Sequence, residues 1–262
     1  MKINNLVEIL EKLAPTSLAE EWDNPGLLVG ERNAEVKKVL VALDATDEVI
    51  DEAVNMNADV IVTHHPMIFG SLKKVNDDTA LGRRIIKLIK NGVAHYAMHT
   101  NLDIAFGGVN DELAKILELK NIGILSVSCE QNGEPNGLGR YGETDEMSLA
   151  EFALKVKEKL GLDAVRFVGD ETKKVSRVGL CTGAGISFMG DAVKKGCDVY
   201  VTSDIKYHES QKALEDGIAL VDATHYGSEN IIVSVISNYL KENAEGIEIF
   251  ESKVNGQVFR TL

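Results

Sequence analysis

The sequence predicts an α/β fold made of two similar, duplicated lobes, each with a mainly parallel sheet. Short apolar, β-branched runs alternate with segments of helical periodicity, once before residue 100 and again after residue 176. Strand–helix–strand alternation is typical of parallel sheets whose faces are covered by helices. Identical residues also recur at a constant offset between the two stretches, which favours duplication of one α/β unit.

The first stretch contains three predicted strands joined by two predicted helices. The strands are residues 37–44, 58–65 and 93–99, and the helices are residues 47–57 and 81–92. The helix periodicity places Val49, Ile50 and Ala53 on one face. Gly92 ends the second helix, because glycine readily adopts the left-handed conformation found there.

The second stretch repeats this order. The strands are residues 177–183, 198–204 and 218–225, and the helices are residues 190–197, 207–217 and 227–243, the last as one long helix. Residues 139 positions apart are identical in several pairs, namely Val36 and Val175, Val39 and Val178, Ala53 and Ala192, Val54 and Val193, Asp59 and Asp198, Val60 and Val199, Val62 and Val201, and Thr63 and Thr202. We therefore expect lobes at residues 1–125 and 126–262, with 126–147 as a connecting segment and no large inserted middle domain.

Composition restricts the possible functions. The 262 residues carry 28 Lys and Arg against 41 Asp and Glu, a net charge of −13, so binding to nucleic acid or anionic membranes is not expected. No apolar run approaches the roughly 20 residues of a membrane span, and the opening MKINNLVEILEKL is amphipathic rather than a signal peptide, so we expect the cytoplasm. The cysteines at 129, 181 and 197 lack CxxC spacing, which predicts buried or half-buried thiols rather than a zinc site.

Two adjacent histidines follow a predicted strand, in the segment VTHHPMIFG at 62–70. Successive side chains of a strand point to opposite faces, so His64 and His65 reach one site only if the strand ends there and the chain turns. Pro66 favours that turn, because it restricts His65 to extended conformations. A lone strand-end histidine is more often an ordinary core or surface group, but an adjacent pair favours metal binding.

Each half also places a histidine four residues before a carboxylate, after its third predicted strand. His99 precedes Asp103, and His225 precedes Glu229, with the same offset of 126 between the halves. Taken singly, these carboxylates would be read as helix caps or turn residues. Their matched positions favour a shared role instead. His65 corresponds to Asp204 at the offset of 139, and His208 lies four residues beyond Asp204.

These side chains predict a metal centre. The carboxyl ends of parallel strands are where ligands bind in α/β folds, so a cleft between two facing lobes would gather these groups. Imidazole nitrogens and carboxylate oxygens without sulfur suit Zn, Fe, Mn, Co or Ni. Five or more such ligands exceed the needs of one catalytic ion, and two divalent ions about 3.5 to 4 Å apart account for the surplus.

The segments VTHHPMIFG, HTNLD, TSDIKYH and HYGSE, with EEWDNPGLLVG (20–30) and GLGRYG (137–142), closely resemble the dinuclear metal-centre hexameric proteins known as GTP cyclohydrolase type 2 homologues, which are YbgI-like. The resemblance covers nearly the whole chain. It implies that Glu229 bridges two ions and that the assembly is a toroidal homohexamer. The metal ligands that it implies are His64, His65, Asp103, His225 and Glu229.

The resemblance leaves several residues with open roles. His99, Asp204 and His208 would lie behind the ligands or face the substrate. Trp22, Asp23 and Asn24 match a motif near the family's N-terminus, although a structural turn explains them equally well. Arg140 would contact an anionic substrate such as a phosphate, or it would stabilise the segment between the halves.

The expected function is that of a dinuclear, divalent-metal-dependent hydrolase. By resemblance, its substrate would be a small molecule such as a purine nucleotide, with GTP opened hydrolytically at its imidazole ring. A two-metal phosphoesterase would use the same ligands. A protein that binds, stores or delivers metal, or that interacts with partners without turnover, is the alternative from another class.

Overall fold

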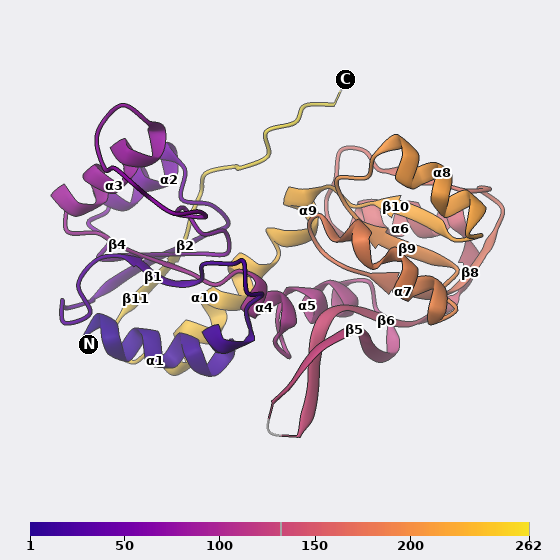
Figure 1. Ribbon diagram of the computed structural model, residues 1–262, viewed down its shortest axis with the longest axis horizontal. Helices are drawn as coiled ribbons and strands as arrows, with labels where there is room; N and C mark the ends of the chain where they lie inside the picture. The colour runs from indigo at the N-terminus through magenta and orange to yellow at the C-terminus, as the bar shows by residue number, and fades with distance from the viewer. Residues whose placement is uncertain (132, 262) are drawn as a thin grey trace. The chain divides into compact units, whose positions relative to one another are not determined.

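Three parallel strands form the centre of a sheet in each half of the chain (Figure 1). The computed structural model describes residues 1–131 and 133–261, and two compact units divide it. Unit one comprises Met1–Ala105 and Ile232–Gly256, and unit two comprises Phe106–Ile231 and the chain from Gln257. The expected lobe boundary after residue 125 therefore falls inside a strand of unit two, and the last long helix belongs to unit one.

The sheet of unit one has the order β1-β4-β3-β2-β11, in which β1 alone among these strands runs antiparallel to its neighbour. Its strands are β1 (Gly26–Val29), β2 (Lys38–Ala42), β3 (Val60–Thr63), β4 (Ala94–Ala97) and β11 (Glu248–Glu251). Its helices are α1 (Ile3–Leu13), α2 (Asp47–Asn55), α3 (Ala80–Lys90), α4 (Thr100–Ile104) and α10 (Ile232–Asn243), with a 3₁₀ turn at Thr16–Leu18. Figure 1 shows α2 and α3 on one face of the sheet and α1 with α10 on the other.

Burial on both faces explains why the central strands of unit one are continuous apolar runs. Every residue of β3 and β4 is buried. The helices begin where side chains cap them: Thr46 accepts a hydrogen bond from Val49 N at the start of α2, and Thr79 accepts one from Gly82 N at the start of α3.

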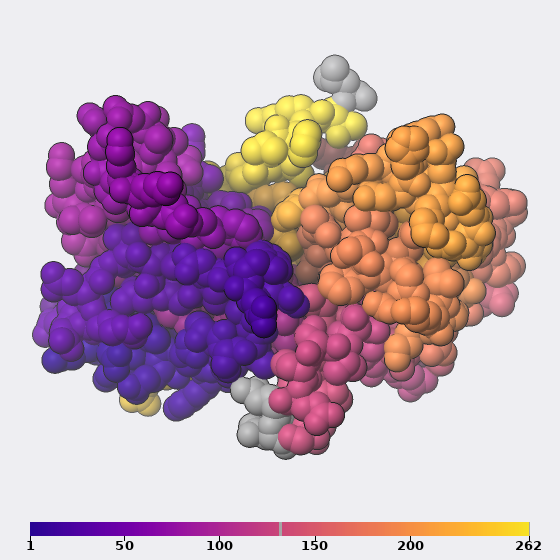
Figure 2. Space-filling model, viewed as in Figure 1, coloured from indigo at the N-terminus to yellow at the C-terminus, as the bar shows by residue number. Residues whose placement is uncertain are grey.

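The sheet of unit two has the order β5-β6-β8-β9-β10-β7. Its strands are β5 (Lys120–Gln131), β6 (Glu134–Ser148), β7 (Arg166–Val168), β8 (Lys174–Leu180), β9 (Val199–Thr202) and β10 (Ala219–Asp222). Its helices are α5 (Val109–Ile116), α6 (Leu149–Lys159), α7 (Met189–Lys194), α8 (Tyr207–Glu215) and α9 (His225–Glu229), with a 3₁₀ turn at Gly185–Phe188. One core cluster packs α5 and α6 against the sheet, and another packs α7 and α8. Atoms of α8 lie at the surface in the orange region of Figure 2.

The duplication inferred from the 139-residue offset is visible in the backbone. Strands β2, β3 and β4 correspond to β8, β9 and β10. In each sheet an antiparallel strand, β1 or β7, pairs with the free edge of the third of these strands. Asp59 Oδ2 accepts hydrogen bonds from the backbone N–H groups of residues 37 and 38 at 2.7 and 2.8 Å. Asp198 Oδ2 accepts the same pair from residues 176 and 177 at 2.9 and 2.8 Å. The two carboxylates therefore perform one structural role at equivalent positions.

Three expectations about the elements need correction. The sheet of unit two is mixed rather than mainly parallel, because β5, β6 and β7 pair antiparallel. The expected connecting segment 126–147 lies largely in the hairpin of β5 and β6. The single helix expected at 227–243 is instead α9 and α10, and the break between them falls where the chain passes from unit two to unit one.

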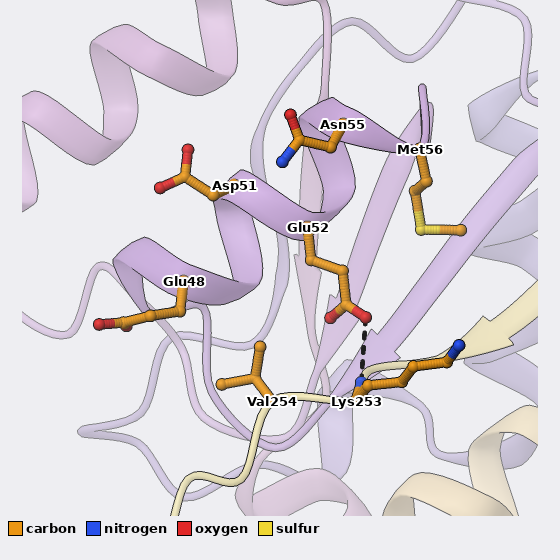
Figure 3. Close-up of a pocket in the computed structure, with 7 residues that line it drawn as sticks. All are labelled: Glu48, Asp51, Glu52, Asn55, Met56, Lys253 and Val254. Atoms are coloured by element: carbon orange, nitrogen blue, oxygen red, sulfur yellow. Dashed lines mark hydrogen bonds between the residues drawn. The ribbon is translucent and has the colours of Figure 1, made fainter.

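The segment after β11 is attached to α2. Glu52 accepts hydrogen bonds from Lys253 N at 3.0 Å and from the Ser252 hydroxyl, and Figure 3 shows the first of these beside a surface cavity of about 620 Å³. The other residues that line the cavity are Glu48, Asp51, Asn55, Met56 and Val254. Glu52 therefore fixes the course of the chain where it leaves the sheet.

The cysteines are free thiols, with Cys181 and Cys197 buried and Cys129 half-buried, which confirms the sequence expectation. None of the helices within residues 1–131 and 133–261 combines the length and the apolar composition needed to cross a lipid bilayer.

Candidate metal centre

The first donor set lies in unit one, at the carboxyl ends of β3 and β4. It consists of His64, His65, His99 and Asp103; the two adjacent histidines follow β3, and His99 is the residue before α4. One ligand nitrogen from each of the three imidazoles lies within 4.8 Å of the others. His64 is fully buried, and its Nε2 lies 3.6 Å from Asp103 Oδ1. Side chains that were selected from the sequence for their chemistry therefore lie together at the carboxyl ends of neighbouring strands.

The three imidazoles of the first donor set are held in one tautomer and orientation. His64 Nδ1 donates to the Met98 carbonyl oxygen at 2.8 Å. His65 Nδ1 donates to Asp44 Oδ1 at 2.7 Å, and His99 Nδ1 donates to Asp23 Oδ1 at 2.8 Å. A carbonyl or carboxylate oxygen only accepts, so the proton is on Nδ1 and the lone pair of Nε2 is presented to the site. Histidines that bind metals are oriented in this way.

Asp23 is the residue that fixes His99. Its side chain is fully buried and accepts hydrogen bonds from Thr100 N at 3.0 Å and from Asn24 N at 2.7 Å. Burial raises the pKa of Asp23, but the hydrogen bonds from His99, Thr100 and Asn24 outweigh burial and lower that pKa to about 2. The motif at residues 22–24 therefore includes a carboxylate that is ionised at neutral pH and orients an imidazole.

The second donor set lies in unit two and consists of Asp204, His225 and Glu229. His225 Nδ1 donates to Asp204 Oδ2 at 2.7 Å, and His225 Nε2 lies 2.9 Å from Glu229 Oε2. Glu229 is 6% exposed. The hydrogen bond to Glu229, opposed by partial burial and reinforced by Asp204, raises the pKa of His225 to about 9. The imidazole is therefore protonated at neutral pH in the metal-free protein, and a metal ion would replace that proton.

Gly183 follows β8 and makes room for Glu229. A Cβ atom at this position would lie 2.0 Å from Glu229 Oε1, and the backbone has a φ of +59°. Gly183 N also donates to the hydroxyl of Ser228 at 3.1 Å, next to the glutamate. Only glycine combines this left-handed conformation with this close approach.

The backbone next to His225 adopts unusual conformations. Asp204 has a φ of +55° and Thr224 has a φ of +57°, although neither is glycine. Non-glycine residues in such regions cost about 1 to 3 kcal/mol each and concentrate at functional sites. Asn57, Glu118 and Asn121 also have positive φ, but these two positions are the residue that orients the His225 ring and the residue that precedes it.

The other two of the six histidines have different surroundings. His95 is buried, its Nε2 is 2.8 Å from the Thr63 hydroxyl, and burial lowers its pKa to about 4. His208 lies exposed on α8 and bonds Gln211 on the same helix at 3.0 Å. The common arrangement of an oxygen-bound Nδ1 with an inward Nε2 therefore belongs to the four histidines of the donor sets.

Arg140 performs a structural role. It is 1% exposed, and its guanidinium binds both carboxylate oxygens of Asp111, at 2.6 and 2.9 Å. Its Nη1 also donates to the carbonyl oxygens of Gly137 and Gly139, each at 2.8 Å. These contacts support the second of its two expected roles, as an anchor of the β6 backbone.

Sequence reasoning missed Asp44 and Gly183. The offset of 139 links them to each other, and it links His65 to Asp204. In unit one Asp44 supports the imidazole at 65, whereas in unit two the carboxylate at 204 supports His225. The sequence therefore contained a signal for Asp44 and Gly183, because they occupy matching positions after duplicated strands, as His65 and Asp204 do.

The donor chemistry fits divalent metal ions. The first set combines three imidazoles with a carboxylate, and the second combines the His225 imidazole with Glu229. Every one of these imidazoles has an oxygen behind its Nδ1. Nitrogen and oxygen ligands of this kind suit Zn, Fe, Mn, Co and Ni. Fold and donor chemistry together define an α/β protein of two duplicated units that carries candidate metal-binding groups on its strand ends.

The chain belongs to the Duf34/NIF3 (NGG1p interacting factor 3) family, whose model matches residues 1–257. A Clostridium perfringens protein named GTP cyclohydrolase 1 type 2 homolog is 40% identical over 255 residues, which cover 97% of each chain. The crystal structure of a Bacillus cereus protein related to NIF3 matches with a TM-score of 0.95 and 29% identity, over 100% of this chain and 99% of that chain. The resemblance inferred from the motifs is thereby confirmed.

Some relatives are longer. A Bacillus subtilis protein that is also named GTP cyclohydrolase 1 type 2 homolog is 29% identical over 364 aligned positions, which cover 98% of each chain. At least 364 − 262 = 102 of those positions have no counterpart in this sequence.

Proposed function

We propose that the protein is a dinuclear, divalent-metal-dependent hydrolase that opens the imidazole ring of a purine nucleotide such as GTP. The observation that carries the metal part is the shared orientation of His64, His65 and His225. Each has its Nδ1 bound to an oxygen acceptor and its Nε2 directed at the donor set. Such oxygen acceptors characteristically support metal-binding histidines.

The proposed ligands are His64, His65, Asp103, His225 and Glu229. Two ions are favoured because five ligands exceed the about three protein ligands of a single catalytic zinc ion. When bound, a pair of divalent ions polarises the substrate and makes a bound water acidic.

The residues around the ligands have proposed roles of their own. Asp44 and Asp204 accept hydrogen bonds from the Nδ1 atoms of His65 and His225, so that Nε2 is the atom of each ring that would bind a metal ion. His99 is not among the five ligands, but its ring centroid lies 5.3 Å from that of His64. We propose that His99 Nε2 accepts and returns a proton during the reaction, held in place by Asp23.

The purine substrate is proposed from the name of the Clostridium perfringens relative. A two-metal phosphoesterase would use the same ligands, and so would a metal-binding protein without turnover. The decisive experiment therefore presents both substrate classes to one preparation.

The protein is stripped of metal, reloaded with Mn, Zn or Fe, and incubated separately with GTP and with bis(p-nitrophenyl) phosphate. We expect loss of the purine absorbance and a product one water heavier than GTP. A His99→Gln variant should lose roughly 100-fold in rate while keeping its metal content. Hydrolysis of the phosphodiester alone would contradict the purine assignment, and no turnover with any of these metals would contradict the hydrolase.

The assembly and location are proposed from the family resemblance: a homohexamer in the cytoplasm that acts on a small molecule. Light scattering on the purified protein measures the assembly directly. A monomeric mass would contradict it.

A further inference from the structure

The one tryptophan of the sequence lies exposed beside the first donor set. Trp22 is 57% exposed and Phe69 is 53% exposed, and their ring centroids are 5.6 Å apart. Each ring centroid lies 6.0 Å from that of His99. Large aromatic side chains stabilise a fold by being buried, so an exposed pair at a candidate site needs a different explanation.

The loops that carry these two rings are joined to the donor set by hydrogen bonds. Asp23, next to the tryptophan, binds His99 and the first residue of α4. Asn24 Nδ2 donates at 2.7 Å to the carbonyl oxygen of Ile68, immediately before the phenylalanine. The motif at 22–24 thus ties both aromatic loops to the histidine, and the rings are positioned before any ligand arrives.

Exposure alone does not single out this pair. Phe106 is 55% exposed, but its ring lies 5.7 Å from the buried Arg140 guanidinium. Tyr207 is 72% exposed on α8, beside the exposed His208. Trp22 and Phe69 differ because they contact each other and because both also contact an imidazole of the donor set.

We propose that Trp22 and Phe69 form a stacking site for a planar heteroaromatic ring, the purine base of the nucleotide; the identity of that ring rests on the proposed function. Every base has a π face that stacks on aromatic side chains, and the large indole of Trp22 offers most area to a two-ring purine. A base held there would present its ring beside His99 and the metal ligands, which is where ring opening requires it.

Because Trp22 is the one tryptophan, its fluorescence reports occupancy of this site without turnover and without metal. The full-length protein in EDTA is titrated with guanosine, with GTP and with tripolyphosphate, which lacks a ring, and free tryptophan corrects for absorbance. We expect saturable quenching by guanosine and GTP but not by tripolyphosphate. Phe69→Ala should raise the Kd for guanosine roughly tenfold, whereas Phe259→Ala, which removes a 78% exposed ring elsewhere, should leave it unchanged.

Trp22→Ala is measured by calorimetry, and it should weaken guanosine binding by roughly tenfold or more. An unchanged Kd in that variant, absent quenching in the parent, or equal effects of the two phenylalanine substitutions would overturn the stacking site. Failure of the proposed function has a different signature. Saturable quenching without GTP turnover would refute the hydrolase alone, and turnover without quenching would refute stacking alone.

Discussion

Replacing Gly183 by alanine tests whether the backbone after β8 is shaped around Glu229. The added Cβ would lie 2.0 Å from Glu229 Oε1, far inside van der Waals contact. Glu229 is 6% exposed and lies 2.9 Å from His225 Nε2. The carboxylate must therefore move, and we expect it to lose its contact with the imidazole.

The size of the effect follows from two contributions. A φ of +59° costs a non-glycine residue about 1 to 2 kcal/mol. Loss of a hydrogen bond to a charged group costs about 1.5 to 3 kcal/mol more. Gly217→Ala is the matched control, because its φ is +75° but its Cβ would have nothing within 4 Å. That variant carries the backbone cost alone.

Urea unfolding of the metal-free proteins measures both variants. We expect Gly183→Ala to lose roughly 2.5 to 5 kcal/mol and Gly217→Ala roughly 1 to 2 kcal/mol. We also expect a lower metal content after reloading in the first variant alone. Equal losses of stability with unchanged metal content would refute the account of Gly183.

Two further predictions concern pH. The pKa of His225 is raised to about 9, so a proton competes with metal for this imidazole at neutral pH. Metal binding by the metal-free protein should therefore strengthen as pH rises toward 9. A Kd for the metal that does not change between pH 6 and 9 would contradict this. The pKa of Asp23 is lowered from 3.8 to about 2, so its stabilisation is present above pH 3.8 and is lost as pH falls through 2. Asp23→Asn should therefore lower the free energy of unfolding by about 2 kcal/mol at pH 7. The difference in stability between the parent and this variant should shrink below pH 3.8. A constant difference between pH 7 and 3 would show that ionisation of Asp23 is not its cause.

The central strands were predictable because they are buried on both faces. Continuous β-branched runs such as residues 60–63 and 199–202 have few other interpretations, and both are strands here. The hairpin of β5 and β6 was missed because β6 contains three glycines and several charged residues, which do not read as a buried strand. Arg140 of β6 is buried in an ion pair with Asp111 of α5, and this pairing is visible only in the three-dimensional structure.

The break between α9 and α10 was also hidden from the sequence. Apolar residues at 231–233 continue the helical periodicity across it, and the break falls where the chain passes from unit two to unit one.

The histidines of the candidate site were predictable from their spacing and their place after strands. Of the residues that support them, Asp204 was expected behind the ligands, whereas Asp44 was not, because support depends on side-chain direction. Asp44 is a single carboxylate after a strand, and only the structure shows that it holds His65 Nδ1. Trp22 and Asn24 had an equally good explanation as a turn until their contacts with Phe69 and Ile68 became visible.

Elemental analysis tests the proposed dinuclear metal centre most directly. The native protein is measured beside His65→Ala, Glu229→Ala and the control His208→Ala, whose imidazole lies exposed on α8. We expect about two ions per chain in the parent and the control, and fewer in both other variants. Parent protein without bound metal after reloading, or full metal content in His65→Ala and Glu229→Ala, would contradict it.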